Sequence, residues 1–294
     1  MDISVIIPTY KKTDMFMANL EHNLPYLKNT QIIVVNDDPH LSIAQSLSRW
    51  PEIILIENST NLGFAGAVNK GIEHVNNSYV MLLNTDVKLN DTSYTTALSH
   101  FSRQPNIFAI SFAQIEKNGE TVGKNRIFWK NGFFQHGRAT DLVFGETGWA
   151  EGGSCIIDVK KYREIGGFDS IYSPFYWEDI DLSYRAWKQG YRVLFDPSIL
   201  VEHHHESTIK SFFSSMFITS IAYRNQLLFI WKNIQDNDLR SQHTIALIKQ
   251  LLRSITTDPA FISGYIRALM KKRDIMNSVK SLRTDHEILA QFTK

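Results

Sequence analysis

Short apolar runs alternate with amphipathic stretches through the first third of the chain. The apolar runs predict strands, and the stretches between them, where apolar residues recur every three or four positions, predict helices. The predicted strands are Ile3–Pro8, Gln31–Asn36, Ile53–Glu57 and Tyr79–Leu83, and the predicted helices are Thr13–Leu27, Leu41–Trp50 and Leu62–Val75. This βαβαβαβ order predicts an α/β fold with a mostly parallel sheet covered by helices on both faces.

The pattern loosens after Phe101 and becomes helical towards the end of the chain. A long loop-rich insertion is predicted over Thr121–Gly148, and long loops of this kind often cover binding sites. The later predicted strands are Ile107–Ile115, Ser154–Val159 and Tyr191–Phe195, the last closed by Pro197, and the predicted helices are Lys160–Ile165 and Glu178–Gln189. We therefore expect an α/β domain over residues 1–208 and a helical C-terminal extension over residues 209–294.

Charge divides the chain at the same place. Up to Glu206 there are 18 basic and 24 acidic residues, whereas from Ile209 to Lys294 there are 13 basic and 6 acidic residues. A basic end often faces an anionic surface such as a membrane, although solvated helix faces explain the same excess. Phe212–Ile234 is rich in apolar residues but is interrupted by polar ones, so it predicts packing on the α/β domain or an interfacial helix rather than a membrane span.

The overall composition excludes several classes of protein. A formal net charge of +1 in 294 residues argues against nucleic acid as the main partner. Cys155 is the only cysteine, so no intramolecular disulfide is expected. The opening MDISVIIPTY lacks the basic and apolar regions of a secretory signal, which favours a cytoplasmic protein.

Polar residues follow the predicted strands at their carboxyl ends, where open α/β sheets bind ligands. They are Thr9-Tyr10-Lys11, Asp37-Asp38, Asn58 and Asn84-Thr85-Asp86. A carboxylate at Asp86 can reach a divalent cation that bridges the phosphates of a nucleotide diphosphate. The alternative is an ordinary turn in which Asn84 and Asp86 bond only the backbone.

Two further groups of residues could carry chemistry. Glu178 and Asp179 begin a predicted helix, where their side chains point about 100° apart, so at most one can face a given acceptor hydroxyl. Acidic residues also favour helix N-termini without any catalytic role.

His203-His204-His205 follows the apolar run Ile199–Val201, and one imidazole could bind a metal ion. The alternative is that the histidine run is an exposed surface segment without a function.

Together and in this order, the motifs resemble one enzyme family. The segments that carry the resemblance are ISVIIPTYKK, IIVVNDD, NLGFAGAVNKGI, YVMLLNTDV, WAEGGSCIIDVKKYREIGGFD, YWEDIDLSYRAWKQGYRV, DPSILVEHHHEST and YRNQLLFIWKN, over roughly residues 3 to 233. The chain resembles the family 2 glycosyltransferases of the GT-A fold, in particular rhamnosyltransferase-like enzymes that assemble bacterial surface polysaccharides such as O-antigen and capsule.

The resemblance implies a role for each matching position. Asp179 would be the general base and Glu178 would orient the acceptor, with Trp149 and Trp177 contacting it. Asp86 and His203 would hold Mg²⁺ or Mn²⁺, although His204 or His205 could replace His203. The donor would be bound by Thr9, Tyr10, Asp37, Asp38, Gly63, Asn69, Asn84, Thr85 and Asp86, with Tyr10 stacking on the nucleobase and Asp37 accepting from the pyrimidine N3–H.

Three positions depart from the family pattern. Asn36 stands where many relatives have an acidic residue, which leaves the choice between Asp37 and Asp38 open. Asn84 replaces the first aspartate of the usual DxD metal motif, so metal binding could be weak or dispensable. Val68 precedes Asn69 where many relatives have arginine.

The resemblance implies inverting, metal-dependent transfer of a sugar from a nucleotide diphosphate to an acceptor hydroxyl. A dTDP-rhamnose donor is favoured, with UDP-hexoses or UDP-N-acetylhexosamines as the alternative, and the acceptor would be a saccharide, free or lipid-linked. Peripheral association with the inner face of an anionic cell membrane and homo-oligomerisation are open expectations.

The rival from another class is a non-catalytic carbohydrate-binding relative with a depleted metal motif. A dehydrogenase is disfavoured because no G-x-G-x-x-G follows Ile3–Ile7, and Pro8-Thr9-Tyr10-Lys11-Lys12 is unlike the Gly-rich loop of nucleotidyltransferases.

Overall fold

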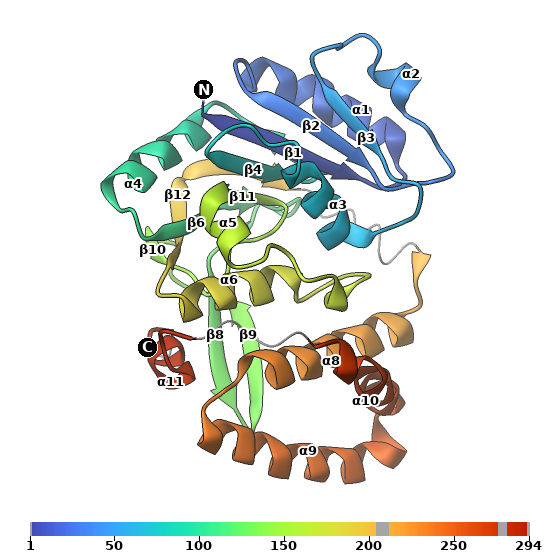
Figure 1. Ribbon diagram of the computed structural model, residues 1–294, viewed down its shortest axis with the longest axis vertical. Coiled ribbons are helices and arrows are strands. Elements are labelled where there is room, and N and C mark those ends of the chain that lie inside the picture. The colour runs from blue at the N-terminus through green and yellow to red at the C-terminus, as the bar shows by residue number, and fades with distance from the viewer. Residues whose placement is uncertain (1, 204–211, 276–280, 293–294) are drawn as a thin grey trace.

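A mixed sheet forms the centre of the computed structural model, which describes residues 2–203, 212–275 and 281–292 (Figure 1). Its main strand order is β10-β12-β6-β11-β4-β1-β2-β3, with β5 paired to β12 and β7 paired to β6. The strands are β1 (Ile3–Thr9), β2 (Gln31–Asn36), β3 (Ile54–Glu57), β4 (Tyr79–Leu83), β5 (Val87–Leu89), β6 (Ile107–Ile115), β7 (Thr121–Val122), β10 (Gly145–Glu146), β11 (Ser154–Asp158) and β12 (Arg192–His203).

The N-terminal half of the sheet is parallel, as the βα alternation predicts. β1 pairs in parallel with β2 and with β4, and β2 pairs in parallel with β3. β11 then lies antiparallel between β4 and β6, so the complete sheet is mixed. The carboxyl ends of β1, β2 and β4 lie at one edge, and the segment before β11 reaches the same edge because β11 runs the other way.

Helices cover both faces of the sheet and continue beyond it. Buried residues of α1, α2 and α4 pack on one face, and those of α3, α5 and α6 pack on the other. The helices of the sheet region are α1 (Thr13–Asn23), α2 (Ala44–Leu47), α3 (Gly63–Ile72), α4 (Ala97–Arg103), α5 (Val159–Glu164) and α6 (Glu178–Lys188), with short 3-10 turns η1 (Leu24–Tyr26), η2 (Ser93–Thr96) and η3 (Ser170–Tyr172). The apolar residues of β1 alternate between the two cores, which explains why both faces need cover.

Two predictions about the chain after Phe101 were wrong in detail. Pro197 does not close the last strand, because β12 continues through it to His203. The register shifts between Asp196 and Leu200, and such an irregularity accommodates a proline that cannot donate to the ladder. The insertion predicted to be loop-rich contains a separate hairpin of β8 (Asn125–Lys130) and β9 (Phe133–Arg138).

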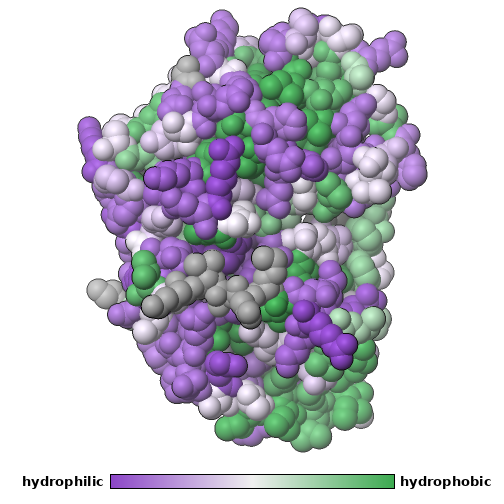
Figure 2. Space-filling model, viewed as in Figure 1, coloured by the Kyte–Doolittle hydropathy of each residue, from purple (hydrophilic) through white to green (hydrophobic). Residues whose placement is uncertain are grey.

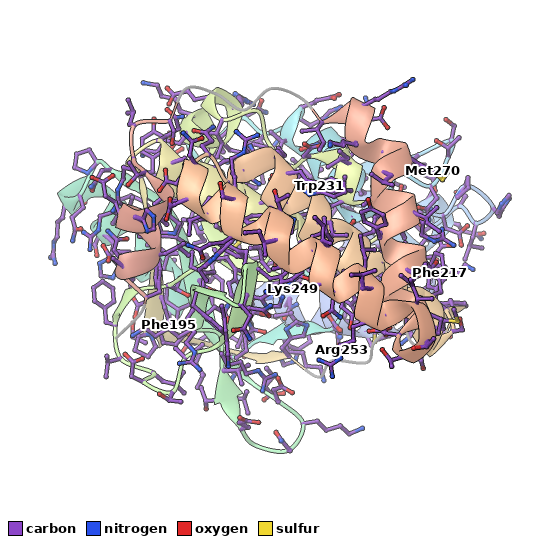
Figure 3. All side chains as sticks on the ribbon, turned by 90° about the horizontal axis from the view of Figure 1, so that it is seen from below. Phe195, Phe217, Trp231, Lys249, Arg253 and Met270 are labelled. Carbon is purple, nitrogen blue, oxygen red and sulfur yellow. The ribbon has the colours of Figure 1, made fainter. Side chains whose placement is uncertain are left out.

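The C-terminal region is helical, as predicted. It comprises α8 (Ser215–Asn233), α9 (Asn237–Thr257), α10 (Pro259–Lys271), the turn η4 (Lys272–Asp274) and α11 (Asp285–Ala290). α8 buries Leu227, Leu228 and Phe229 in the same core as α6 and β9, whereas α9 crosses the lower face of the molecule (Figures 1 and 3). Figure 2 shows hydrophobic surface gathered at this lower end. Across the described residues, none of the helices combines the length and the apolar character that spanning a bilayer requires.

Candidate functional site

Two adjacent carboxylates open α6 at the edge of the sheet. The backbone reaches them through Tyr176 and Trp177, which have φ angles of 70° and 78°, a region that residues other than glycine seldom adopt. Asp179 accepts a hydrogen bond from the backbone N–H of Ile180 at 2.8 Å. Glu178 Oε2 is buried and has no hydrogen-bond partner among the described residues. Taken as whole residues, Glu178 and Asp179 are only partly buried, so the pair lies near the surface of the molecule.

The surroundings of the pair favour protonated carboxyls. Burial, followed by the neighbouring charge of Asp179, raises the pKa of Glu178. Burial, followed by the charge of Glu151, raises the pKa of Asp179. Raised carboxyl pKa values in a partly open site are typical of groups that accept or donate protons in catalysis.

The loop Glu151–Gly153 connects this pair to the end of β4. A Cβ atom on Gly152 would lie 2.9 Å from the Phe64 ring and 3.8 Å from Asp179 Cβ, so Gly152 lets the loop approach Asp179 closely. A Cβ atom on Gly153 would lie only 2.4 Å from Asn84 Nδ2. The Asn84 N–H donates to the Gly153 carbonyl at 2.9 Å. The two glycines therefore hold the acidic pair and the Asn84–Asp86 segment together.

Asp86 and His203 meet on the other side of this loop. β5 pairs antiparallel with β12 and aligns Val87 with His203, which places His203 Nε2 3.2 Å from Asp86 Oδ1. α1 fixes the segment around Asp86, because Asn19 Nδ2 donates to the Thr85 carbonyl at 2.8 Å and Asn23 Nδ2 donates to the Val87 carbonyl at 2.9 Å. The sequence-predicted metal pair is thus brought together by strand pairing.

A chain of amides orients the His203 ring. Asn125 Nδ2 and Gln114 Nε2 donate to the two oxygens of Glu151, at 3.0 and 3.1 Å. The Gln114 amide oxygen then lies 2.5 Å from His203 Nδ1. Because that oxygen only accepts, Nδ1 carries a proton, and Nε2 is the ring nitrogen that faces Asp86. The same Glu151 that raises the pKa of Asp179 therefore also helps to fix the histidine.

This arrangement fits a shared divalent cation. The carboxylate oxygen suits Mg²⁺ or Mn²⁺, whereas the imidazole nitrogen is a softer ligand that favours Mn²⁺ over Mg²⁺, and a metal-bound histidine needs its other nitrogen held as Gln114 holds Nδ1. The described part of the chain contains no group of three or more His, Cys, Asp or Glu that could form a metal site without further ligands. The alternative ligands His204 and His205 lie outside the described residues.

The end of β1 presents an aromatic ring and a cation. Thr9 is buried, and its carbonyl accepts from the Asp37 N–H at 2.8 Å. Tyr10 is exposed, and Lys11 Nζ lies 5.0 Å from its ring centroid and 4.4 Å from that of Phe212. An exposed ring beside a cation suits a base and its phosphates; the contacts predicted for Thr9 and Tyr10 stay predictions.

Asp37 organises the loop that leads into α3. Its Oδ1 accepts from Asn58 Nδ2 at 2.8 Å and from the Leu62 N–H at 2.9 Å, and its Oδ2 accepts from the Gly63 N–H at 2.8 Å. Burial raises its pKa although these hydrogen bonds oppose the shift. Asp38 Oδ1 accepts from the His40 N–H at 3.1 Å. Oδ2 of Asp37 therefore keeps acceptor capacity, and the base contact predicted for this pair is untested.

Asn69 is engaged within the protein. Its Oδ1 accepts from the Tyr162 hydroxyl at 2.5 Å and from the Phe168 N–H at 3.2 Å, and its Nδ2 donates to the Phe168 carbonyl at 2.8 Å. These bonds tie α3 to the loop before η3. The donor contact predicted for Asn69 is not tested by them.

The two predicted acceptor residues lie together under a histidine. Trp149 and Trp177 are both buried, and the His136 ring meets them edge-on with centroid distances of 5.4 and 5.0 Å. Burial lowers the pKa of His136. Sequence reasoning did not single out His136, because it lies in the hairpin that was predicted to be loop.

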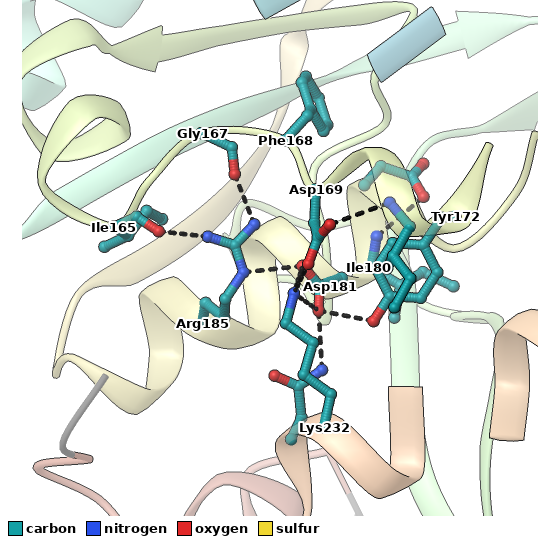
Figure 4. Close-up of polar contacts among 12 residues, drawn as sticks. Ile165, Gly167, Phe168, Asp169, Tyr172, Ile180, Asp181, Arg185 and Lys232 are labelled. Carbon is teal, nitrogen blue, oxygen red and sulfur yellow. Dashed lines mark hydrogen bonds and ion pairs between the residues drawn. The ribbon is translucent and has the colours of Figure 1, made fainter. Parts of the chain in front are cut away.

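A buried ionic network surrounds Asp181, in the same helix as the acidic pair (Figure 4). Asp181, one turn into α6, accepts from Arg185 Nε at 2.7 Å and from the Tyr172 hydroxyl at 2.8 Å. α8 supplies Lys232 Nζ at 3.0 Å and Asn233 Nδ2 at 2.8 Å. The cations of Arg185 and Lys232 lower the pKa of Asp181 although its burial opposes this. Asp181 is therefore a charged structural centre rather than a second base.

The comparisons with known proteins agree with this geometry. The family model described as Glycosyl transferase family 2 matches residues 4–166, more than half of the chain. The chain belongs to glycosyl transferase family 2. Its segments from β1 to α5 are the part that defines this membership, and the α6 pair follows directly after them.

Curated relatives of this family 2 chain include a bacterial rhamnosyltransferase and a bacterial poly-N-acetylglucosamine synthase. An N-acetylglucosaminyl-diphospho-decaprenol L-rhamnosyltransferase of Mycobacterium tuberculosis is 26% identical over an alignment of 188 residues; the match covers 54% of this chain and 61% of that protein. A poly-beta-1,6-N-acetyl-D-glucosamine synthase of Staphylococcus aureus is 20% identical over an alignment of 238 residues; the match covers 73% of this chain and 57% of that protein. The chain thus spans less than two thirds of the length of either relative.

Solved structures identify the fold as GT-A. GalNAc-T7, crystallised with UDP, GalNAc and Mn²⁺, superposes with a TM-score of 0.65 at 15% identity, covering 99% of this chain and 58% of that one. A Pyrobaculum calidifontis mannosyltransferase in complex with GDP-Man and Mn²⁺ superposes with a TM-score of 0.54 at 14% identity, covering 92% of this chain and 75% of that one. The fold predicted from the motifs is confirmed.

Proposed function

We propose that this family 2 glycosyltransferase moves a sugar with inversion from a nucleotide diphosphate to an acceptor hydroxyl. The observation that carries the proposal is the convergence of Glu178 and Asp179 with the Asp86–His203 pair on the loop Glu151–Gly153. The acidic pair can serve a hydroxyl nucleophile, and the second pair can serve a diphosphate. A non-catalytic sugar-binding protein has no need for this pairing.

Asp179 is the proposed general base. Its carboxylate removes the acceptor hydroxyl proton while the oxygen forms a bond to the anomeric carbon and the bond to the diphosphate breaks. Glu178, whose buried Oε2 has no hydrogen-bond partner among the described residues, would orient the acceptor. One displacement inverts the anomeric centre, and the proton stays on Asp179 until solvent removes it.

A divalent cation, Mg²⁺ or Mn²⁺, is the proposed cofactor. Asp86 and His203 would hold it, with Glu151 and Gln114 fixing the ring that binds it. When bound, the cation neutralises the negative charge of the leaving diphosphate. Asn84 supplies no carboxylate, so the binding should be weaker than at a site with two aspartates. Lys11 is the alternative cation near the expected phosphates.

The donor and acceptor classes are inferred from the relatives. The 26% identical rhamnosyltransferase supports a dTDP-rhamnose donor and a diphospholipid-linked saccharide acceptor. The glucosamine polymer synthase supports UDP-N-acetylhexosamine as the alternative. Trp149 and Trp177, buried beneath the ring of the exposed residue His136, would support an aromatic floor suited to a sugar ring, and Tyr10 offers a surface for the base. A lipid-linked acceptor would make the protein peripheral at the cytoplasmic side of a cell membrane.

A donor panel tests the proposal. The chain is incubated with dTDP-rhamnose, UDP-glucose, UDP-N-acetylglucosamine and GDP-mannose, with Mg²⁺, Mn²⁺ or EDTA, and released nucleoside diphosphate and glycosylated acceptor are measured. We expect one donor to be turned over, and EDTA, D86A and H203A each to weaken it. Donor binding without release or transfer for any sugar would favour the non-catalytic alternative, and turnover unaffected by EDTA would assign the leaving-group charge to Lys11.

A further inference from the structure

The outer face of α9 carries a stripe of exposed apolar side chains. Ile245, Ile248, Leu252 and Ile255 are 57%, 55%, 70% and 68% exposed. At about 100° per residue these four positions fall within a sector of about 80°, on the side opposite the buried His243 and Ser254. The stripe therefore runs along the helix and faces away from the core.

Neighbouring residues of α10 enlarge the apolar surface. Ile266, Leu269 and Met270 are 52%, 44% and 76% exposed. Figure 2 shows hydrophobic surface concentrated at the lower end of the molecule, where Figure 1 places α9 and α10. Contiguous exposed apolar surface on a soluble fold marks an interaction site more often than single exposed residues do.

The charge of the elements that carry the stripe is mainly positive. From Asn237 to Asp274, which spans α9 to η4, the sequence has seven basic residues and three acidic residues, Asp238, Asp258 and Asp274. Asp258 is engaged, since it caps the Phe261 N–H at 3.0 Å and accepts from the Tyr223 hydroxyl at 2.9 Å. Lys249 and Arg253 lie on α9 beside the stripe (Figure 3), about 40° and 80° around the helix from Ile245. They can reach anionic groups while the stripe is buried.

We infer that the outer face of α9, together with the exposed end of α10, docks on an anionic lipid surface. An apolar stripe flanked by lysine and arginine is the pattern of a helix that lies in the membrane interface with its apolar side among the acyl chains. A second copy of this chain fits less well, because two such faces would bring like charges together. The inference extends the proposed function, because a lipid-linked acceptor would lie in such a membrane. Only the biological purpose of the docking rests on the proposed function.

Docking on α9 would also orient the site. Trp129 Nε1 in the β8–β9 hairpin donates to Gln242 Oε1 at 2.9 Å, and the Gly132 carbonyl lies 2.9 Å from His243 Nδ1. A Cβ atom on Gly132 would lie 2.3 Å from Ala246 Cβ, so the hairpin end is packed tightly on α9. The same hairpin carries His136 to Trp177. One rigid connection thus joins the proposed membrane face to the proposed acceptor floor.

Vesicle co-sedimentation of the full chain tests the inference without donor or acceptor. We expect sedimentation with phosphatidylglycerol-containing vesicles, weak sedimentation with neutral phosphatidylcholine vesicles, and release at 1 M salt, where the screening length falls to about 3 Å. The double variant I248Q/L252Q should lower the apparent partition coefficient at least about tenfold, since each change removes an apolar side chain from the lipid. K249Q/R253Q should lower it about fivefold for each charge removed.

The matched control is L41Q/V143Q, which alters two side chains that are 48% and 62% exposed and lie outside α9 and α10. It should bind vesicles as the parent does, and all variants should keep the parent's melting temperature. Absence of sedimentation, or equal sedimentation of the parent and I248Q/L252Q, would overturn the inference. So would a dimer in light scattering that I248Q/L252Q dissociates, because the face would then bind a second copy. Nucleotide release in solution is scored separately, so failure here is distinct from failure of the proposed reaction.

Discussion

At the scale of single residues, surroundings distinguish three carboxylates that the sequence places within one turn. Glu178 and Asp179 have raised pKa values because burial and neighbouring negative charge disfavour ionisation. Asp181 has a lowered pKa because Arg185 and Lys232 outweigh its burial. From the sequence, the EDID run shows only that a helix begins with acidic residues. The assignment of roles requires the partners from α8 and from the loop at Glu151, which lie far away in the chain.

Replacement of the proposed base should separate binding from chemistry. D179N keeps the size of the side chain but cannot remove a proton, so kcat should fall by about 10²–10⁴ while donor affinity is nearly unchanged. Steady-state turnover and donor titration measure the two effects. D238N, at an exposed aspartate outside the site, is the control. Turnover within a few-fold of the parent would remove Asp179 from this role and make E178Q the next variant to measure.

The pH dependence of turnover should respond to Glu151. A base must be deprotonated to act, so the raised pKa of Asp179 places the acidic limb of the profile at higher pH than an ordinary aspartate would. In E151Q the neighbouring negative charge is gone, which lowers the pKa of Asp179 and should move the acidic limb to lower pH. Profiles of kcat/KM for the parent, E151Q and the exposed control E52Q provide the comparison. An unmoved limb in folded E151Q would contradict this coupling.

At the scale of elements, α8 acts as the support of the catalytic helix. Asn225 Nδ2 donates to the carbonyls of Tyr172, Phe175 and Tyr176 at 2.8, 2.9 and 2.8 Å. Arg224 Nη2 donates to the Tyr172 carbonyl at 3.0 Å. These bonds hold the turn whose positive φ angles aim Glu178 and Asp179, and the strain of that turn is compensated by α8.

Loss of the charge at Asp181 should destabilise this support. D181N leaves the buried Arg185 without its carboxylate partner and leaves Lys232 paired with Asp169 alone, and breaking a buried ion pair typically costs about 3–5 kcal/mol at neutral pH. Because the pKa of Asp181 is lower in the folded state, its stabilisation is present above the unfolded pKa of about 3.9 and fades as pH falls through the native value. Urea unfolding at pH 7 and at about pH 3 measures both effects. A destabilisation that does not shrink at acid pH would contradict the ionic account.

The pattern of apolar and polar residues predicted those strands whose bounds depend only on their own sequence. β2, β4 and β6 have the predicted bounds, because each is an apolar run between polar residues. β12 was cut short at Pro197, since the sequence does not show that a register shift takes the proline out of the ladder. The β8–β9 hairpin was not predicted, although Asn131-Gly132 is a turn sequence between two segments that contain aromatic residues. The hairpin packs on α9 and Trp177, and these contacts between distant parts of the chain are not visible in the local pattern.

At the scale of the molecule, the candidate site residues could be predicted because several segments carry family motifs. The contacts that join these residues to one another could not be predicted from the sequence. Asp86 and His203 are 117 positions apart and meet only through the pairing of β5 with β12. The missed residues Gln114 and Asn125 lie on β6 and β8, and their side chains acquire a function only when Glu151 reaches them. The family motifs predict which side chains contact ligands. The side chains that orient those ligand-contacting groups can be identified only from the fold.

Contacts between the two predicted parts of the chain bear on whether residues 1–208 fold alone. Lys232 reaches Asp169 and Asp181 at 2.6 and 3.0 Å. Asp285 on α11 accepts from the Tyr184 hydroxyl at 2.5 Å and pairs with Lys188 at 2.6 Å. Burial of Leu227, Leu228 and Phe229 adds about 1.5–3 kcal/mol each, a sum comparable to the net stability of a typical domain.

A chain that ends after residue 208 should therefore lack a cooperative transition and expose apolar surface, although it contains the whole sheet. A chain that ends after residue 275 keeps α8 to α10 and should unfold cooperatively at a lower temperature than the full chain, because it loses only α11. Calorimetry and binding of a hydrophobic dye measure both variants, with nucleotide binding as a second readout. If residues 1–208 melt cooperatively and bind nucleotide diphosphate as the full chain does, the domain boundary predicted at residue 208 is a real one and α8 is dispensable for the site.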